Sequence, residues 1–198
     1  MDRWLRQVPN VISSLRIVLV IPIALTLLHH QFITTIALFG LAAASDAADG
    51  FLAKCFGWQS ALGAILDPIA DKLLLATVFV MLAILGLVPL WLMATAVARD
   101  VIIVLGAIAY RVYIGPVEAR PSVISKVNTV CQAAFILCVI GREQFSVPAS
   151  WVVVMLGALT FVTVMISGID YVLRYGNRAW AEAKSRRALA GGGGTKLT

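Results

Sequence analysis

The sequence has little charge for its length and few cysteines. Only 13% of its 198 residues are Asp, Glu, Lys or Arg, whereas 61% are hydrophobic; soluble globular proteins carry about 25% charged residues. Its three cysteines have no paired spacing, so nothing indicates a disulfide framework or a zinc site. A chain this apolar cannot bury its surface in one soluble core, and we therefore expect lipid to be its solvent.

Six long apolar runs predict an all-α fold, an integral membrane bundle of six transmembrane helices. The expected spans are 10–29, 32–55, 62–86, 89–113, 122–140 and 148–174. Each is near the ~20 helical residues that cross the ~30 Å hydrocarbon core of a bilayer. Residues 1–8 set apolar side chains against charged ones, which predicts a short interfacial helix before the first span. We therefore expect one membrane domain over residues 1–180 and a flexible basic, Gly-rich tail over 181–198.

The net charge of +6 is explained by membrane topology rather than by a nucleic-acid partner. Cytoplasmic loops of membrane proteins retain an excess of Lys and Arg. With six spans, only Arg142 falls on one side, and the other side holds Arg3, Arg6, Lys54, Arg111, Arg120, Arg174, Arg178, Lys184, Arg186 and Arg187. We therefore expect both termini and the 2–3 and 4–5 loops to be cytoplasmic, in a bacterial inner membrane.

Four aspartates fall close together at the junction of the second and third expected helices. Asp46 and Asp49 are spaced i,i+3, and Asp67 and Asp71 are spaced i,i+4, so each pair shares one helical face, about 5–6 Å apart. A charge at membrane depth costs about 2.5–3.5 kcal/mol, and clustered carboxylates also repel one another. The short connection at 55–61 should fold helix 3 back against helix 2, so that all four carboxylates meet around a cation. Hard oxygen donors suit Mg²⁺, Mn²⁺ or Ca²⁺, and not zinc.

Small residues and one cation lie between the acids. Gly50, Ala53 and Gly63 keep the helix surfaces bare, which lets a ligand or a neighbouring backbone approach closely. Lys54 adds positive charge beside the expected metal ions. Carboxylate-held metal ions next to a cation are what a pyrophosphate needs for displacement at phosphorus. A small cation transporter would also need such acids to bind its ion. The four aspartates, however, are expected at the cytoplasmic end of the helices, and no series of charged residues continues from them to the other side of the membrane.

Read in order, these positions spell Asp46-x-x-Asp49-Gly50-x-x-Ala53-Lys54, eight further residues, and Gly63-x-x-x-Asp67-x-x-x-Asp71. This motif resembles the signature of the CDP-alcohol phosphatidyltransferases, and the resemblance extends from Asn10 to about the end of the sixth span. One position departs from it. Family members usually have Arg where this chain has Lys54, which keeps the charge but loses the bidentate fork.

The resemblance implies a six-helix homodimeric enzyme whose site opens to the cytoplasm and holds Mg²⁺ or Mn²⁺, expected as two ions. By that likeness Asp46, Asp49 and Asp67 ligate metal, and Asp71 ligates metal or takes the proton from the attacking hydroxyl. The likeness assigns nucleotide or pyrophosphate binding to Asp46, Gly50, Ala53, Lys54, Gly63 and Asp67. A CDP-linked lipid as the phosphatidyl donor is implied by the resemblance alone.

Residues farther along the chain bear on the acceptor alcohol. Arg99-Asp100 and Ser125-Lys126-Val127-Asn128 resemble the eukaryotic-type cardiolipin synthases, which join CDP-diacylglycerol to phosphatidylglycerol. Phosphatidylglycerophosphate synthases typically have Arg-Glu, another Arg two turns later, and Gly-Lys-x-Lys at these places. Glycerol 3-phosphate is a dianion that calls for several cations, whereas this chain has Ala107 and Asn128 at the two extra positions. The interpretation is therefore a cardiolipin synthase that releases CMP, with glycerol 3-phosphate as the alternative acceptor.

Four residues are expected to contact the phosphate of the acceptor or of a lipid: Arg16, Arg99, Lys126 and Asn128. Arg16 also has a second interpretation, because an arginine near a helix end can snorkel to the membrane interface. We expect metal-assisted direct displacement with no covalent intermediate, since no Ser, Cys or His is an obvious nucleophile beside the aspartates.

Overall fold

The computed structural model describes the backbone of residues 8–56, 63–113 and 123–192, and the side chains of 15–45, 69–106 and 123–173. Six helices make up this part of the chain, and it contains no strand, which confirms the all-α prediction. The helices are α1 (Val8–Leu28), α2 (Phe32–Phe56), α3 (Gly63–Ile84), α4 (Leu90–Tyr113), α5 (Val123–Phe145) and α6 (Ser150–Gly192). The interfacial helix expected over residues 1–8 lies almost wholly outside the described residues.

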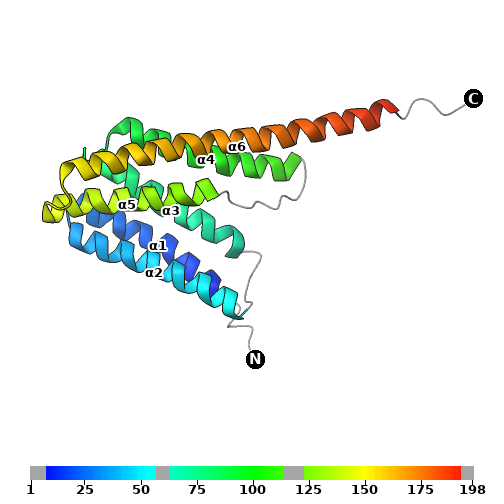
Figure 1. Cartoon of the computed structure of the whole chain (residues 1–198). Coiled ribbons are helices and arrows are strands. Elements are labelled where there is room, and N and C mark those ends of the chain that lie inside the picture. The colour runs from blue at the N-terminus through cyan, green and yellow to red at the C-terminus, as the bar shows by residue number, and fades with distance from the viewer. Residues whose placement is uncertain (1–7, 57–62, 114–122, 193–198) are drawn as a thin grey trace, which may run out of the picture.

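Successive helices run up and down, so that the end of α2 and the start of α3 lie at the same end of the bundle (Figure 1). Helix α1 packs against both α2 and α3, α6 packs against α4 and α5, and α5 also contacts α2 and α3. Within the part of the chain that is described, α2 and α3 do not pack on each other. The end of α2 and the start of α3, where helix 3 was expected to fold back against helix 2, fall outside the residues whose side chains are described. That direct packing therefore stays a prediction, and the described parts of both helices pack against α1.

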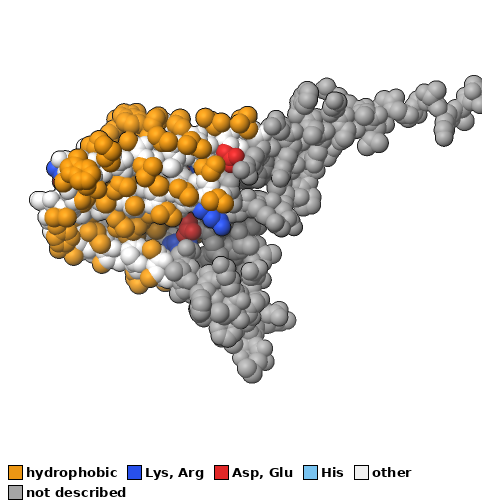
Figure 2. All heavy atoms as spheres, in the orientation of Figure 1, with side chains coloured by type: hydrophobic (Ala, Val, Ile, Leu, Met, Phe, Trp, Pro, Cys, Tyr) orange, Lys and Arg blue, Asp and Glu red, His pale blue; other side chains and the backbone are white. Residues whose placement is uncertain are grey.

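The core joins the helices through fully buried apolar side chains. Phe79 of α3 and Phe135 of α5 lie with their ring centroids 5.9 Å apart, and Ile23, Leu82 and Ile136 are completely buried around them. The face of the described residues seen in Figure 2 is also largely apolar. More than half of the surface of several large side chains is exposed, including Val18, Ile21, Val130 and Val154. Such a surface suits contact with lipid tails.

Two described segments are long and apolar enough to cross a bilayer, Val123–Phe145 and Ser150–Leu173. Two shorter apolar helical segments, Leu15–Leu28 and Phe32–Ser45, accompany them. The chain is thus a helical protein with membrane-capable helices, and the six-span topology stays a prediction.

Helix α6 runs past residue 174, where the last span was expected to end, and continues to Gly192 beyond the rest of the bundle (Figure 1). The segment after residue 174 is rich in Ala, Glu, Lys and Arg, which are strong helix formers. The tail expected to be flexible from residue 181 is therefore helical as far as Gly192 in this structure. Residues 193–198 lie outside the described part.

The turn after α3 ends the helix in a defined way. Gly86 has φ of 73°, and its N–H donates to the Ala83 carbonyl at 3.0 Å while that of Leu87 donates to the Leu82 carbonyl at 2.9 Å. This pair of bonds is a Schellman motif, which needs the left-handed conformation that glycine adopts readily. The turn leads the chain directly into α4, the helix that carries Arg99 and Asp100 of the polar cluster described below.

We expect Gly106→Ala to destabilise the contact between α4 and α6. A Cβ at Gly106 would lie 2.7 Å from Tyr171 Oη and 2.9 Å from Tyr171 Cε1, and Tyr171 donates a hydrogen bond to the Ile103 carbonyl at 2.9 Å. The ring must move, at a cost of about 1–3 kcal/mol, so the unfolding temperature in detergent should fall by several degrees. Gly40→Ala on α2 is the matched control, because nothing lies within 4 Å of its added Cβ. Equal stability of the two variants would contradict this packing.

Candidate active site

The four aspartates of the motif lie on helices as predicted. Asp46 and Asp49 are in the last turns of α2, and Asp67 and Asp71 are in the first turns of α3. These helix ends lie at the same end of the bundle (Figure 1). Asp71 is the member of the set whose side chain is described. The predicted roles of the other motif residues concern side chains outside the described part, namely those of Asp46, Asp49, Asp67, Gly50, Ala53, Lys54 and Gly63.

Asp71 forms an ion pair with Arg16 of α1. The Arg16 Nη1 group donates a hydrogen bond to Asp71 Oδ1, and the Arg16 side chain is 1% exposed while that of Asp71 is 39% exposed. Arg16 therefore points into the bundle, and does not snorkel to the interface. Burying a guanidinium without a counter-charge is very costly. The Asp71 carboxylate is thus part of what allows α1 to place an arginine between the helices.

Arg99 is the centre of a second polar cluster. Its Nη1 donates to Asp100 Oδ1 at 2.5 Å, and its Nη2 donates to Ser125 Oγ at 2.9 Å and also to Ser167 Oγ. Lys72 on α3 pairs with the same Asp100 oxygen at 3.1 Å. The cluster therefore joins α3, α4, α5 and α6 through one buried guanidinium and one carboxylate. Only 4% of the Arg99 side chain is exposed, so its expected contact with an acceptor phosphate stays a prediction.

The other two expected acceptor residues lie on α5 in different surroundings. Asn128 is completely buried, and its Oδ1 accepts a hydrogen bond from Thr163 Oγ1 at 3.1 Å. Lys126 is exposed. On the described parts of α4 and α5, three buried donors have no hydrogen-bond partner, namely Arg99 Nε, Asn128 Nδ2 and Gln132 Nε2. Because buried polar groups are almost always paired, such donors favour an oxygen-rich ligand or ordered water in this region.

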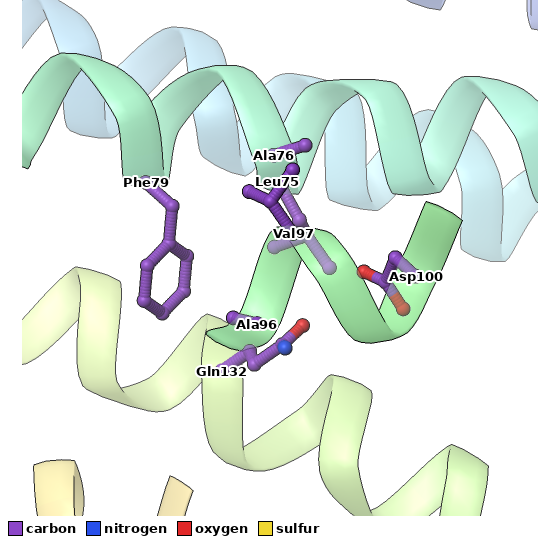
Figure 3. Close-up of a pocket in the computed structure, with 7 residues that line it drawn as sticks. All are labelled: Leu75, Ala76, Phe79, Ala96, Val97, Asp100 and Gln132. Carbon is purple, nitrogen blue, oxygen red and sulfur yellow. The ribbon is translucent and has the colours of Figure 1, made fainter. Parts of the chain in front are cut away.

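A narrow cleft between α3, α4 and α5 lies beside the Arg99 cluster (Figure 3). Phe79 stands at one end and Asp100 at the other, and Gln132 points in from α5. The lining residues are Leu75, Ala76, Phe79, Ala96, Val97, Asp100 and Gln132. As it stands the cleft has no room for a ligand, so it marks where polar groups border the apolar core and is not a substrate pocket.

Three residues of the Arg99 cluster had no role in the sequence-based prediction. Lys72 and Asp100 stand out in the sequence as charges inside apolar runs, which is a signal that a functional or paired group is present. Ser167 carries no such signal, because a single serine in a transmembrane helix is common. Its contact with Arg99 depends on how α6 lies against α4, which the local pattern does not reveal.

The motif residues fit a divalent cation by their chemistry. All four acids supply carboxylate oxygens, the donors that Mg²⁺ and Mn²⁺ prefer, and the described Asp71 carboxylate is partly accessible. Within the described residues no group of three or more His, Cys, Asp or Glu side chains could hold a metal ion, since three of the four acids fall outside that part. The residues that would hold the ion are therefore Asp46, Asp49, Asp67 and Asp71.

Comparisons with known proteins identify relatives of this chain. Human cardiolipin synthase (CMP-forming) is 30% identical over 187 residues, which cover 86% of this chain and 62% of the human protein. A probable phosphatidylglycerophosphate synthase of Mycobacterium tuberculosis is 31% identical over 172 residues, covering 83% of this chain and 79% of the relative. The chloroplastic CDP-diacylglycerol–glycerol-3-phosphate 3-phosphatidyltransferase 1 of Oryza sativa is 28% identical over 192 residues, covering 88% and 58%.

The chain thus spans less than two thirds of the human and rice relatives. A family model described as CDP-alcohol phosphatidyltransferase matches residues 6–169, which include all six helices up to the middle of α6 and every motif aspartate. This chain belongs to the CDP-alcohol phosphatidyltransferase family.

Proposed function

We propose that this protein transfers the phosphatidyl group of CDP-diacylglycerol to phosphatidylglycerol, forming cardiolipin and releasing CMP. The observation that carries the proposal is the family match over residues 6–169 together with the aspartate motif on α2 and α3. The cation transporter considered from the sequence finds no support among the relatives, whose names describe synthases and transferases.

The chemistry follows from the groups at this end of the bundle. A divalent cation, when bound by the four aspartates, neutralises charge on the pyrophosphate. Asp71 accepts the proton of an acceptor hydroxyl as that oxygen attacks the phosphorus that bears the diacylglycerol. The bond from this phosphorus to the CMP oxygen breaks, so a new phosphodiester forms and CMP leaves with the electron pair. Gly50, Ala53 and Gly63 line the nucleotide, and Lys54 offsets negative charge on CMP.

Phosphatidylglycerol is favoured as the acceptor by the modest positive charge of the Arg99 region. The Arg99 guanidinium is already paired with Asp100, and Asn128 is a neutral buried amide. Among the described residues of this region, the exposed Lys126 is a cation placed to meet a phosphodiester that carries one negative charge. Glycerol 3-phosphate would bring two negative charges into this region, which calls for more cations. It is kept as the alternative acceptor because the mycobacterial and rice relatives bear names of that reaction class.

The proposed setting is a bacterial inner membrane. Six spans, both termini on the cytoplasmic side and a homodimeric assembly complete the proposal. The apolar flank of the described helices (Figure 2) suits lipid contact, and the charged side chains visible there gather mainly toward the end where α2 ends and α3 begins. A lipid substrate would thus reach the aspartates sideways from the cytoplasmic leaflet.

A single assay tests the function, the acceptor and the metal requirement together. Purified protein in mixed micelles receives CDP-diacylglycerol and Mg²⁺ or Mn²⁺, with either phosphatidylglycerol or glycerol 3-phosphate, and the lipid product is identified by mass spectrometry. We expect cardiolipin and CMP with phosphatidylglycerol, and turnover lower by about tenfold or more with glycerol 3-phosphate. A chelator should abolish both products, and excess Mn²⁺ should restore them.

Three other outcomes would change the proposal. Faster turnover with glycerol 3-phosphate would favour the alternative acceptor. Full activity in the presence of the chelator would remove the metal from the mechanism. No CMP release with either acceptor would reject the proposed function.

A further inference from the structure

Arg16 is a buried charge that the proposed chemistry does not use. Its side chain is 1% exposed, which makes it the largest fully buried side chain among the described residues. A group that binds the phosphate of a diffusing lipid must be reachable from the substrate side. The structure instead places this guanidinium inside the bundle, in contact with Asp71.

The position of α1 explains why an arginine is buried here. Helix α1 packs against both α2 and α3, the two helices that carry the four aspartates. Arg16 and Asp71 each lie eight residues after the first residue of their helix, about 12 Å along the axis at 1.5 Å per residue. They therefore meet at the same depth, one turn further from the bundle end than Asp67.

The contact constrains the one aspartate expected to handle a proton. A carboxylate on a helix can rotate about two side-chain bonds, and a charge-assisted hydrogen bond from a fixed donor removes that freedom. Arg16 is such a donor because packing on all sides holds its own side chain in place. The Asp71 side chain is not enclosed in this way, since 39% of it is exposed. One member of the pair is anchored in the core and the other faces the site.

We propose that Arg16 is a positioning residue, which holds the Asp71 carboxylate in the orientation that the reaction requires. This inference rests on the proposed function for the role of Asp71. It replaces the expectation that Arg16 binds a lipid or acceptor phosphate. It predicts that Arg16 affects turnover and the geometry around a bound metal ion through Asp71, and leaves substrate affinity nearly unchanged.

Kinetics of Arg16→Met and Arg16→Lys give the first test. For Arg16→Met we expect kcat to fall by about tenfold or more, because a misplaced reacting group is costly. The KM for CDP-diacylglycerol should change by less than about threefold. Arg16→Lys keeps one charged donor but not the planar fork, so its kcat should fall by only about two- to fivefold. Arg142→Met, which removes an arginine at the opposite end of the bundle, is the matched control and should keep the wild-type kcat.

A spectroscopic comparison without substrate gives the second test. The electron paramagnetic resonance spectrum of bound Mn²⁺ reports the arrangement of its ligands, and it is recorded for the wild type, Arg16→Met, Asp71→Asn and the double variant. We expect both single variants to alter the spectrum, and the double variant to match Asp71→Asn. This non-additivity is the signature of one residue acting through another. A charge that acted on the metal ion directly would change the spectrum further in the Asp71→Asn background.

The outcomes separate this inference from the proposed function. A raised KM with unchanged kcat in either Arg16 variant would overturn the positioning role, because that is the effect of losing a substrate contact. If folded Arg16→Met keeps both the wild-type kcat and the wild-type Mn²⁺ spectrum, the positioning role is rejected. The ion pair would then serve only the packing of α1 against α3. If Arg16→Met does not fold, the kinetics of Arg16→Lys decide. If the wild type releases no CMP, the proposed function fails, whereas the Mn²⁺ comparison still tests the coupling.

Discussion

Asp71→Asn should lower CMP release from CDP-diacylglycerol by about a hundredfold or more, the range that a positioned general base contributes. Asparagine has nearly the shape of aspartate but cannot accept the proton of an alcohol at neutral pH. It also carries no charge for a divalent cation. The measurement is the initial rate of CMP formation at saturating Mn²⁺ and phosphatidylglycerol.

The same substitution has a second effect, which the Arg16 contact makes predictable. The amide oxygen of Asn can still accept the hydrogen bond of Arg16, but the charge–charge attraction between Asp71 and the buried guanidinium is lost. Because 39% of the Asp71 side chain is exposed, solvent screens this pair, and its loss should cost less than the about 3–5 kcal/mol of a fully buried pair. The unfolding temperature in detergent should therefore fall while the protein remains folded. Glu143→Gln is the control, because Glu143 is an exposed acid on α5 near the opposite end. Near-normal turnover in folded Asp71→Asn would refute the role of Asp71 as the base.

Arg99→Met should lower the stability of the folded protein strongly. The guanidinium donates to Asp100, Ser125 and Ser167, and its loss leaves Asp100 paired with Lys72. We expect the free energy of unfolding to fall by about 3–5 kcal/mol. Ser167→Ala removes one hydrogen bond of the same cluster and should cost only about 1 kcal/mol. Thermal unfolding of the three proteins in one detergent makes the comparison.

The Arg99 cluster also predicts a kinetic effect on the acceptor. If Arg99 and its neighbours form the wall against which the acceptor head group binds, Arg99→Met should raise the KM for phosphatidylglycerol by about tenfold and leave that for CDP-diacylglycerol nearly unchanged. Ser167→Ala should change neither. Equal loss of affinity for both lipids in Arg99→Met would instead assign the cluster to stability alone.

The positions of the helices and of the motif were predictable from local pattern. Apolar runs of spanning length located the starts of all six helices within a few residues, because membrane-length helices leave a strong composition signal. The end of α6 was missed, because the helix continues past the apolar run to Gly192. The spacing of Asp46, Asp49, Asp67 and Asp71 placed each pair on a helix, as the structure confirms for the backbone. The convergence of all four carboxylates stays a prediction, because three of those side chains fall outside the described part.

The neighbour relations were not predictable from local pattern. A short connection between helices 2 and 3 favoured direct packing of those two helices, and it gave no sign that the described parts of both would pack against α1. Hydrophobic periodicity tells which face of a helix is buried, but it does not tell which helix covers that face. Arg16 therefore looked like an interfacial residue, although its partner is an acid two helices later. The signal was present as a pair of opposite charges, Arg16 and Asp71, each inside an apolar run.

Asp71, with which Arg16 forms its ion pair, lies 55 residues further along the chain, so α1 leaves the ribosome well before that carboxylate. In a membrane-embedded chain, a charged side chain at membrane depth costs about 2.5–3.5 kcal/mol on insertion scales. Helix α1 gains the stabilising contact with Asp71 only when α3 arrives beside it. The order in which the protein matures in the membrane would thus differ from the order in which it is translated.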